Sequence, residues 1–481
     1  MQYDQPYSAS ELKGSLANNP TLLSSTTAAA ISTLLALDTA ESVSVASWDG
    51  VSAPVSPEGT TPALVSATIA GAAGQNVAVA IPAELSTAQA FVFDSDANLV
   101  VSFNTPAPVA TFAALAEGDV SASATTDSTP DLIVTTDAGD DTLIFTGDRN
   151  VYVDGREGND TIITAAGNDT IYGGAGNNVI LSGAGNDEIF LAGTADVVDA
   201  GEGYDVVHLG GSRQDYDFTV GNNFNVNLTG TQTASITHAE FLSFDNNESV
   251  ALVDSEAEAA ALRLFQGLLG RDADKDGAQL WAAQAEAGVS TTAIAQEFLN
   301  SSEYTVVSNE AFVESLYTQI LQRDTTNIDE AGVQSWLNTL AAGGTRTDVV
   351  SAIATSQEAI SNDQSNGSYV QGLYQSALGR GAEADGLNNW VSQLVNGASR
   401  TEVAATILNS AEAGQKINSD FIDSLYTNAL GRSATEDAAS KAGWIDYIAQ
   451  GHTLADVAIA IVGSEEATNT IDNVIVIHGQ V

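Results

Sequence analysis

The sequence predicts a multidomain α+β protein. It would have an N-terminal helical and β-sandwich-like region, a central coil of short parallel strands, and a C-terminal α-helical repeat domain. Three observations predict this order. A nine-residue period runs from Thr136 to His208, strand-like alternation fills about 45–125, and a period near 54 residues, marked by tryptophan, begins near residue 254. Periods of these lengths indicate stacked repeats.

Each nine-residue unit ends its loop on an acid or an amide. These residues are Asp141, Asn150, Asp160, Asp169, Asn178, Asp187, Asp196 and Asp205. An apolar residue follows two positions later, namely Leu143, Tyr152, Ile162, Ile171, Ile180, Ile189, Val198 and Val207. One step is ten residues, and we assign the extra residue to Asp154. Glycine lets each loop turn sharply. The x-apolar-x triplet then forms a strand whose central side chain points inward, and neighbouring turns must stack to bury it.

The loops bring carboxylates and backbone carbonyls together, and Ca²⁺ prefers such all-oxygen surroundings. Mutual repulsion of the carboxylates would couple ion binding to folding. A glycine-rich disordered linker is the alternative, and the strict period argues against it.

This stretch resembles the RTX nonapeptide family of secreted bacterial proteins. The resemblance implies a parallel β-roll in which two repeats complete one coil and acids two repeats apart share an ion. Carried over, one edge holds Asp169, Asp187 and Asp205, and the other holds Asp141, Asp160, Asn178 and Asp196. The loop glycines at these sites are Gly139, Gly158, Gly167, Gly176, Gly185 and Gly203. Sites that touch Asn150, Asn178, Asp148 or Thr194 should be weaker or empty, because these residues depart from the pattern.

The chain is strongly acidic. It has 62 Asp+Glu against 14 Lys+Arg, a formal charge of −48 and a pI near 4.1. Nucleic acid is therefore excluded as a partner, because phosphate contacts need clustered cations. Acidity also keeps a secreted protein soluble. There is no cysteine, so disulfides are excluded and Ca²⁺ becomes the expected staple.

We expect an extracellular or cell-surface protein. No apolar run is long enough to span a bilayer, and Met1–Asp4 does not begin a cleaved signal peptide. The RTX resemblance implies type I secretion through an uncleaved C-terminal signal. The tail around Val474–Ile477 fits such a signal, and a final strand is the alternative.

We predict five regions: 1–44, partly helical; 45–130, a small β-sandwich; 131–210, the β-roll; 211–253, a segment that caps the roll; and 254–481, four helical repeats with the secretion signal. In the first region, Ser24 to Thr26 would cap a helix and Glu11 to Leu16 would form another. In the second, strands are expected at 63–69, 77–81, 90–93 and 99–103.

The helical repeats carry one tryptophan each. These are Trp281, Trp336, Trp390 and Trp444. Each tryptophan is preceded by a short segment that begins with an aromatic residue and ends with an arginine. These arginines are Arg271, Arg323, Arg380 and Arg432. We expect about three helices per unit, packed through tryptophan, with arginine near a helix C-terminus. This half resembles a helical domain of unknown function from bacterial secreted and surface-layer proteins, with the best motif match at Gly270 to Trp281.

A second candidate metal loop is Asp272, Asp274 and Asp276, followed by Gly277. Its spacing matches the start of an EF-hand loop, but the twelfth position is Ala283 rather than an acid. The alternative is a solvated loop that begins a helix. The sequence contains no HExxH helix, no G-x-S-x-G elbow and no cysteine nucleophile, so we expect no enzyme.

The expected function is structural: a secreted calcium-binding protein that assembles with itself into a surface layer, filament or matrix. The alternative is a calcium-dependent adhesin that recognises a glycan or cell surface. A third and weaker hypothesis places an enzyme in the unassigned N-terminal part.

Overall fold

The computed structural model describes residues 6–20, 22–57, 60–105, 129–362 and 365–477. The chain divides into two compact units. The first comprises residues 1–255, with the short stretches 274–279 and 473–481. The second comprises residues 256–273 and 280–472. Parallel sheets dominate the first unit and helices dominate the second, which agrees with the predicted α+β class.

The first unit begins with two helices, α1 (Ala9–Ala17) and α2 (Ser25–Leu34), beside the short strands β1 (Tyr7–Ser8) and β2 (Ser42–Val43). As predicted, a serine caps α2: the Ser24 hydroxyl accepts a hydrogen bond from the Thr27 N–H at 3.1 Å. The buried faces of both helices pack on outward side chains of a sheet, including Val92, Ile133 and Tyr152.

Two long sheets form the rest of this unit. The strands of the eleven-stranded sheet are β3 (Val45–Trp48), β4 (Leu64–Thr68), β6 (Ala90–Asp94), β8 (Leu132–Thr135), β10 (Val151–Asp154), β12 (Thr170–Gly174), β14 (Glu188–Leu191), β16 (Val206–His208), β20 (Phe241–Ser243), β21 (Ser249–Val253) and β22 (Val474–Val476). Those of the nine-stranded sheet are β5 (Asn76–Ala80), β7 (Asn98–Thr105), β9 (Thr142–Gly147), β11 (Thr161–Ile163), β13 (Val179–Leu181), β15 (Ala195–Asp199), β19 (Thr233–Thr237), β18 (Asn225–Gly230) and β17 (Tyr216–Val220).

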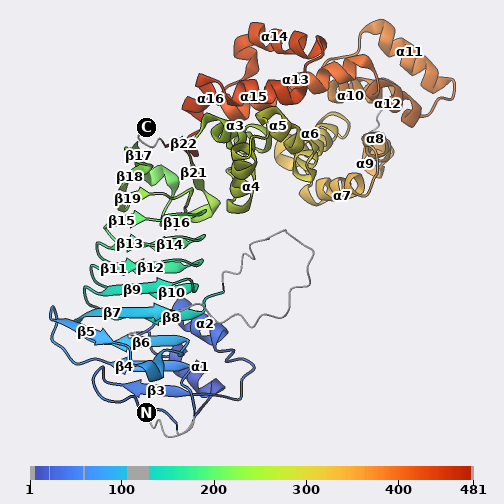
Figure 1. Cartoon of the computed structure of the whole chain (residues 1–481). Coiled ribbons are helices and arrows are strands. Elements are labelled where there is room, and N and C mark those ends of the chain that lie inside the picture. Colours follow the sequence, from blue (N-terminus) through green and yellow to red (C-terminus); the bar gives the residue numbers. More distant parts are fainter. Residues whose placement is uncertain (1–5, 21, 58–59, 106–128, 363–364, 478–481) are drawn as a thin grey trace, which may run out of the picture. The chain divides into compact units, whose positions relative to one another are not determined.

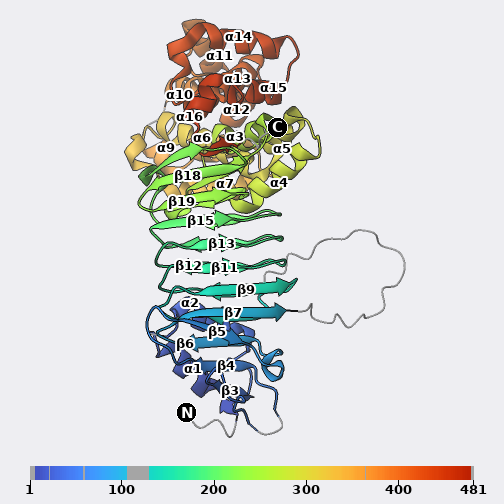
Figure 2. The same cartoon turned by 60° about the vertical axis from the view of Figure 1, so that its left-hand side comes forward.

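Successive strands of the repeats alternate between the two sheets. Each strand therefore pairs in parallel with the strand two places before it in the sequence. Ile171 pairs with Ile189, and Ile162 pairs with Ile180, each 18 residues on. Two nine-residue units therefore complete one coil, as the family resemblance implied. Figure 2 shows β7, β9, β11, β13 and β15 following one another along the nine-stranded sheet.

The predicted separate β-sandwich at 45–130 is wrong. The expected strands are present, but β6 pairs in parallel with β8 and β7 pairs in parallel with β9. The same two sheets therefore run without a break from this region into the nine-residue repeats. Alternating apolar residues specify a buried strand face equally well in a sandwich and in a coil, so the pattern alone could not separate them.

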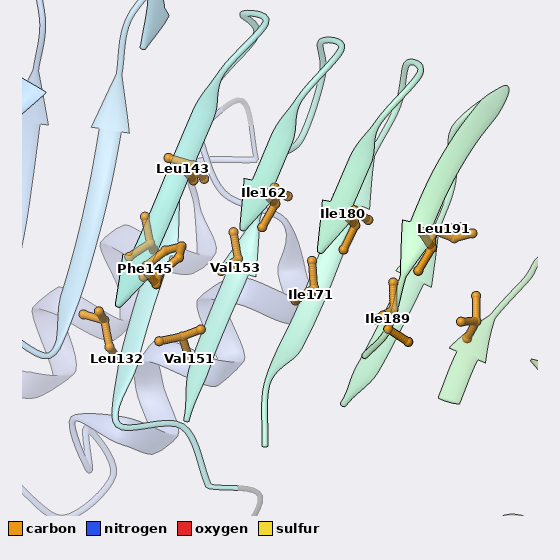
Figure 3. Close-up of a cluster of buried hydrophobic side chains, with 14 of the residues drawn as sticks. Leu132, Leu143, Phe145, Val151, Val153, Ile162, Ile171, Ile180, Ile189 and Leu191 are labelled. Atoms are coloured by element: carbon orange, nitrogen blue, oxygen red, sulfur yellow. The ribbon is translucent and has the colours of Figure 1, made fainter. Parts of the chain in front are cut away.

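An aliphatic column fills the space between the sheets. Leu143, Ile162 and Ile180 project from one sheet and Ile171 and Ile189 from the other, and all five are fully buried (Figure 3). The side chains of the coils before and after it exclude water from each side chain of the column. Removal of one such group costs about 2–5 kcal/mol when isoleucine is cut to alanine.

The segment after the repeats covers the end of the coil. Strands β17, β18 and β19 form an antiparallel meander, and β21 runs antiparallel to β20. This agrees with the predicted capping role. The C-terminal stretch forms β22, which pairs with β21, so Val474–Val476 is a strand.

The second unit is helical. Its helices are α3 (Glu256–Leu264), the π-helical turn η4 (Phe265–Leu269), α4 (Lys275–Glu286), α5 (Thr291–Asn300), α6 (Ser302–Gln319), α7 (Glu330–Ala341), α8 (Arg346–Ala354), α9 (Gln357–Ser361), α10 (Asn366–Leu378), α11 (Ala384–Val395), α12 (Arg400–Leu408), α13 (Ala411–Leu430), α14 (Ala438–Ala449), α15 (Leu454–Val462) and α16 (Glu465–Thr470). The first turn of α4 is the stretch that groups with the first unit.

One arginine contact recurs in all four helical repeats. Each arginine lies over the ring six residues before it, with 4.9 Å from the Arg271 guanidinium to the Phe265 ring centre and 5.2 Å for Arg380 over Tyr374. Each also pairs with a glutamate at the start of a later helix. The four pairs are Arg271–Glu303, Arg323–Glu358, Arg380–Glu412 and Arg432–Glu466. We call this contact the arginine clamp.

Candidate metal centre

The loops of the coil are packed so closely that glycine is required. At Gly185 φ is +135°, and an added Cβ would lie 1.9 Å from the Gly167 carbonyl oxygen. At Gly203 φ is +146°, and the same distance, to the Gly185 carbonyl oxygen, would be 1.7 Å. A side chain would therefore force neighbouring loops apart. Gly158, Gly167 and Gly176 share the positive φ, whereas Gly139 lacks it and approaches Ala97 instead.

The predicted acids form two rows, one along each edge of the roll. In the first row, the Asp141 N–H donates to Asp160 at 2.8 Å, the Asp160 N–H to Asn178 at 2.9 Å, and the Asn178 N–H to Asp196 at 2.8 Å. In the second row, the Asp169 N–H donates to Asp187 and the Asp187 N–H to Asp205, both at 2.8 Å. One side-chain oxygen of each acceptor therefore connects its coil to the coil before it.

The other carboxylate oxygen of four of these acids is an orphan. The Oδ2 atoms of Asp160, Asp169, Asp187 and Asp205 are buried, and none has a hydrogen-bond partner among the described residues. All four side chains are at most 1% exposed. An unpaired buried anion is costly, so these atoms call for a cation or a proton.

The pKa values show the same deficit of positive charge. Burial, with a smaller contribution from neighbouring acids of the row, raises the pKa of Asp169 to about 8 and that of Asp205 to about 9. Burial likewise raises the pKa of Asp160 to about 8, and those of Asp141 and Asp187 to about 6. The pKa of Asp196 is also raised by burial.

The predicted register is wrong in one coil. The Asn168 N–H donates to Asn150 and the Val151 N–H donates to Asp169, both at 2.8 Å. Asn150 therefore precedes the row position, and Val151 occupies it.

The inward residue of this coil is accordingly Val153, which pairs with Ile171, whereas Tyr152 packs with the α1–α2 helices. The extra residue thus lies before Asn150 and is not Asp154. The Asp154 carboxylate instead accepts a hydrogen bond from the Ser24 hydroxyl at 3.0 Å, beside α2.

The donor set fits a hard cation held by few side chains. Within the described residues, no group of three or more His, Asp or Glu side chains converges on one point. Any ion here would draw on paired carboxylates of successive coils and on loop carbonyls, which matches the oxygen preference and the flexible coordination of Ca²⁺. Zinc and copper favour imidazole or thiolate ligands, which the rows lack.

The loop at Asp272 begins a helix, which is the alternative to a calcium-binding EF-hand loop. Helix α4 begins at Lys275, so Asp276 and Gly277 lie in its first turn. The Gly277 N–H donates to Asp274 Oδ1 at 2.9 Å, which is the bond of a helix cap. The three predicted ligands, Asp272, Asp274 and Asp276, therefore do not wrap one point as an EF-hand loop does.

Sequence reasoning missed a further member of the second row, Glu240. The Asp205 N–H donates to Glu240 Oε2 at 2.7 Å, as the Asp187 N–H donates to Asp205. Glu240 lies outside the nine-residue period because β17, β18 and β19 intervene. A signal was present in the sequence, because Glu240 directly precedes a strand whose central residue, Leu242, points inward, as each aspartate of the second row does.

Comparison with known families gives two matches. The model of the RTX calcium-binding nonapeptide repeat matches residues 154–189 and 173–207. The model of a domain of unknown function, DUF4214, matches residues 303–362, 359–417 and 414–471. No curated protein matches the chain. The first acid row begins at Asp141, before the residues that match the nonapeptide repeat, and the second row continues after them to Glu240. The arginine clamp of Arg271 lies in a unit that precedes the residues matched by DUF4214.

Proposed function

We propose that this chain, which carries calcium-binding RTX nonapeptide repeats and copies of the DUF4214 domain, is a secreted structural protein that assembles with itself. Its acid rows would hold Ca²⁺ through Asp141, Asp160, Asn178 and Asp196 on one edge and Asp169, Asp187 and Asp205 on the other. Carbonyls of the stacked loop glycines would complete the sites. The ion would supply the positive charge that the orphan carboxylate oxygens lack.

The two family matches support a proposal about where the protein is located and whether it is an enzyme. RTX repeat proteins are typically secreted by type I systems, and we propose the same route here. No helix in the described part of the chain has the length and hydropathy to cross a membrane. The two matched families are structural or non-catalytic in general, so we propose no enzymatic activity.

An apolar strip on the outside of the roll carries the assembly proposal. Val197 is 50% exposed, and Val179 and Leu181 are each 38% exposed. Val179 pairs with Val197, and Leu181 pairs with Ile163, so the strip crosses adjacent strands of the nine-stranded sheet. A flat aliphatic sheet face suits contact with a second copy of the chain. The net charge of −48 opposes such contact until cations bind.

Electron microscopy and light scattering of purified protein test this proposal. Ordered sheets or filaments should form with Ca²⁺ and dissolve with EGTA. The double variant Val179→Lys/Val197→Lys should bind calcium normally but not assemble. Val220→Lys is the matched control, because Val220 is 44% exposed on β17. A wild-type protein that stays monomeric at every calcium concentration would contradict the proposal.

A cavity in the last helical repeat favours the second candidate, a calcium-dependent adhesin. It measures about 420 Å³, within the range of about 300–1,000 Å³ typical of ligand sites. Tyr426, Trp444 and Tyr447 line it beside Arg432 and Glu466. Aromatic faces next to hydroxyl and charged groups suit a sugar. Glycan-array binding that is lost in Trp444→Ala but kept in Trp390→Ala, the equivalent position one unit earlier, would support adhesion.

A further inference from the structure

The capping segment continues the second acid row by one coil. Phe241 pairs with Val206, and Leu242 pairs with Val207. The Phe241 N–H donates to the Asp205 carbonyl at 3.1 Å, just as the Val206 N–H donates to the Asp187 carbonyl at 2.8 Å. Glu240 therefore stands one coil beyond Asp205 in the stack, although 35 residues separate the two in sequence.

The side-chain contacts are also equivalent. Glu240 Oε2 accepts the Asp205 N–H at 2.7 Å, and Asp205 Oδ1 accepts the Asp187 N–H at 2.8 Å. Asp205 is fully buried, and its Oδ2 has no hydrogen-bond partner among the described residues. A buried, unpaired carboxylate oxygen next to a second carboxylate indicates a missing cation.

The first row ends differently and serves as an internal comparison. The residue that pairs with Asp196 in the next coil is Ala234, which carries no side-chain oxygen. Capping the coil therefore does not by itself require an acid at the row position. The second row has one, and its last aspartate keeps an orphan oxygen.

We propose that Glu240 is a calcium ligand, and that it completes with Asp205 a terminal site binding the capping segment to the roll. The site lies beyond the residues that match the nonapeptide repeat. It differs from the others because its second acid is a glutamate supplied by the cap. Calcium at this place would hold β20 against β16. The proposal depends on calcium binding by the repeats and is independent of self-assembly.

Calcium stoichiometry of the full chain tests this proposal, measured by equilibrium dialysis and by isothermal titration. Glu240→Gln keeps an oxygen for the Asp205 N–H but removes the charge, so it should bind one calcium ion fewer than the wild type. Glu240→Asp keeps a carboxylate and should retain more of the site than the glutamine variant. Glu248→Gln is the matched control in the same cap, where Glu248 accepts bonds from Ser212 and the Arg213 N–H. It should bind the wild-type number of ions.

Hydrogen exchange gives a second measurement. In the wild type, calcium should slow amide exchange in β20 and β21, and in Glu240→Gln this slowing should be lost while β12 and β14 remain protected. Wild-type stoichiometry together with wild-type protection of the cap in Glu240→Gln would overturn the proposal. If Glu240→Gln fails to fold, Glu240→Asp takes its place: weaker binding of one ion in that variant supports the site, and a calcium isotherm identical with that of the wild type overturns it.

Discussion

The two repeat arrays place their acids in opposite surroundings. In the roll, Asp187 and its neighbours are buried beside one another, and burial raises their pKa values. In the helical unit, Glu412 pairs with Arg380, and this hydrogen-bonded partner lowers the pKa of Glu412. The acids of the roll therefore lack a positively charged partner in their row, whereas the glutamates of the helical unit have one in the chain. The difference predicts which half responds to calcium.

Calcium removal should have the largest effect. Chelation leaves the roll with several uncompensated buried carboxylates, while the arginine clamps stay intact, so the roll should unfold and the helices should persist. Hydrogen exchange with and without EGTA should show loss of protection in β9–β16 and little change in α10–α15. An equal loss of protection in the roll and in the helices would contradict the predicted difference between the two units.

Gly185→Ala should be a strongly destabilising substitution. Its Cβ would lie 1.9 Å from a backbone oxygen at positive φ, so the free energy of unfolding of the calcium-bound roll should fall by about 3 kcal/mol or more. Urea denaturation measures this change. Gly210→Ala is the control, because open space surrounds that position, and its effect should stay within about 0.5 kcal/mol.

The two units should also differ in their response to pH without calcium. The folded pKa values of Asp169 and Asp205, about 8 and about 9, exceed the unfolded value of about 4. The stability that these groups contribute is full below pH about 4 and is lost as pH rises through 8 to 9. Metal-free roll should therefore resist urea better at pH 5 than at pH 9.

Glu412 has a lowered pKa, so its contribution to the helical unit is present at neutral pH and is lost as pH falls below its unfolded value. Acid should thus weaken the helices under conditions in which it stabilises metal-free roll. A roll whose urea midpoint rises with pH in the absence of calcium would refute the explanation based on orphan carboxylates.

Asn178→Asp should make the first row resemble the second. Asn178 lies between Asp160 and Asp196 and donates to the Gly174 carbonyl at 3.2 Å. The new carboxylate loses that bond and adds charge, so calcium affinity should rise by about tenfold while metal-free roll becomes less stable. Calorimetric titration checks the first effect and urea denaturation the second. The reverse change in the second row, Asp187→Asn, should lower calcium affinity.

Loss of one arginine clamp should have the smallest effect. Glu412→Gln removes a half-exposed ion pair, and such pairs contribute about 0.2–1 kcal/mol. Thermal unfolding of the helical unit should shift slightly, and calcium binding should not change. Glu310→Gln, an exposed residue of α6, provides the baseline.

The sequence predicts the residues of the acid rows wherever the nine-residue period is unbroken. It fails at Val151 because one inserted residue leaves two adjacent apolar side chains, Tyr152 and Val153, and both are buried, on opposite faces of the sheet. It misses Glu240 because a meander interrupts the period while strand pairing continues. In the helical unit, the positions of arginine and tryptophan are visible in the sequence. The glutamate partners, 32–35 residues later, are identified only when the helices close in space.

The hydrogen bonds along each row make every interior acid common to two coils. Asp187, for example, accepts from the coil before it and donates to Asp205 in the coil after it. Such an array behaves as a one-dimensional chain with nearest-neighbour coupling. We therefore expect that calcium bound at one pair of coils lowers the free energy of binding at the next pair, and that the calcium titration is steeper than independent sites allow. Asn178 keeps both hydrogen bonds of the first row but brings no charge for an ion, so we expect that row to fill more gradually than the second.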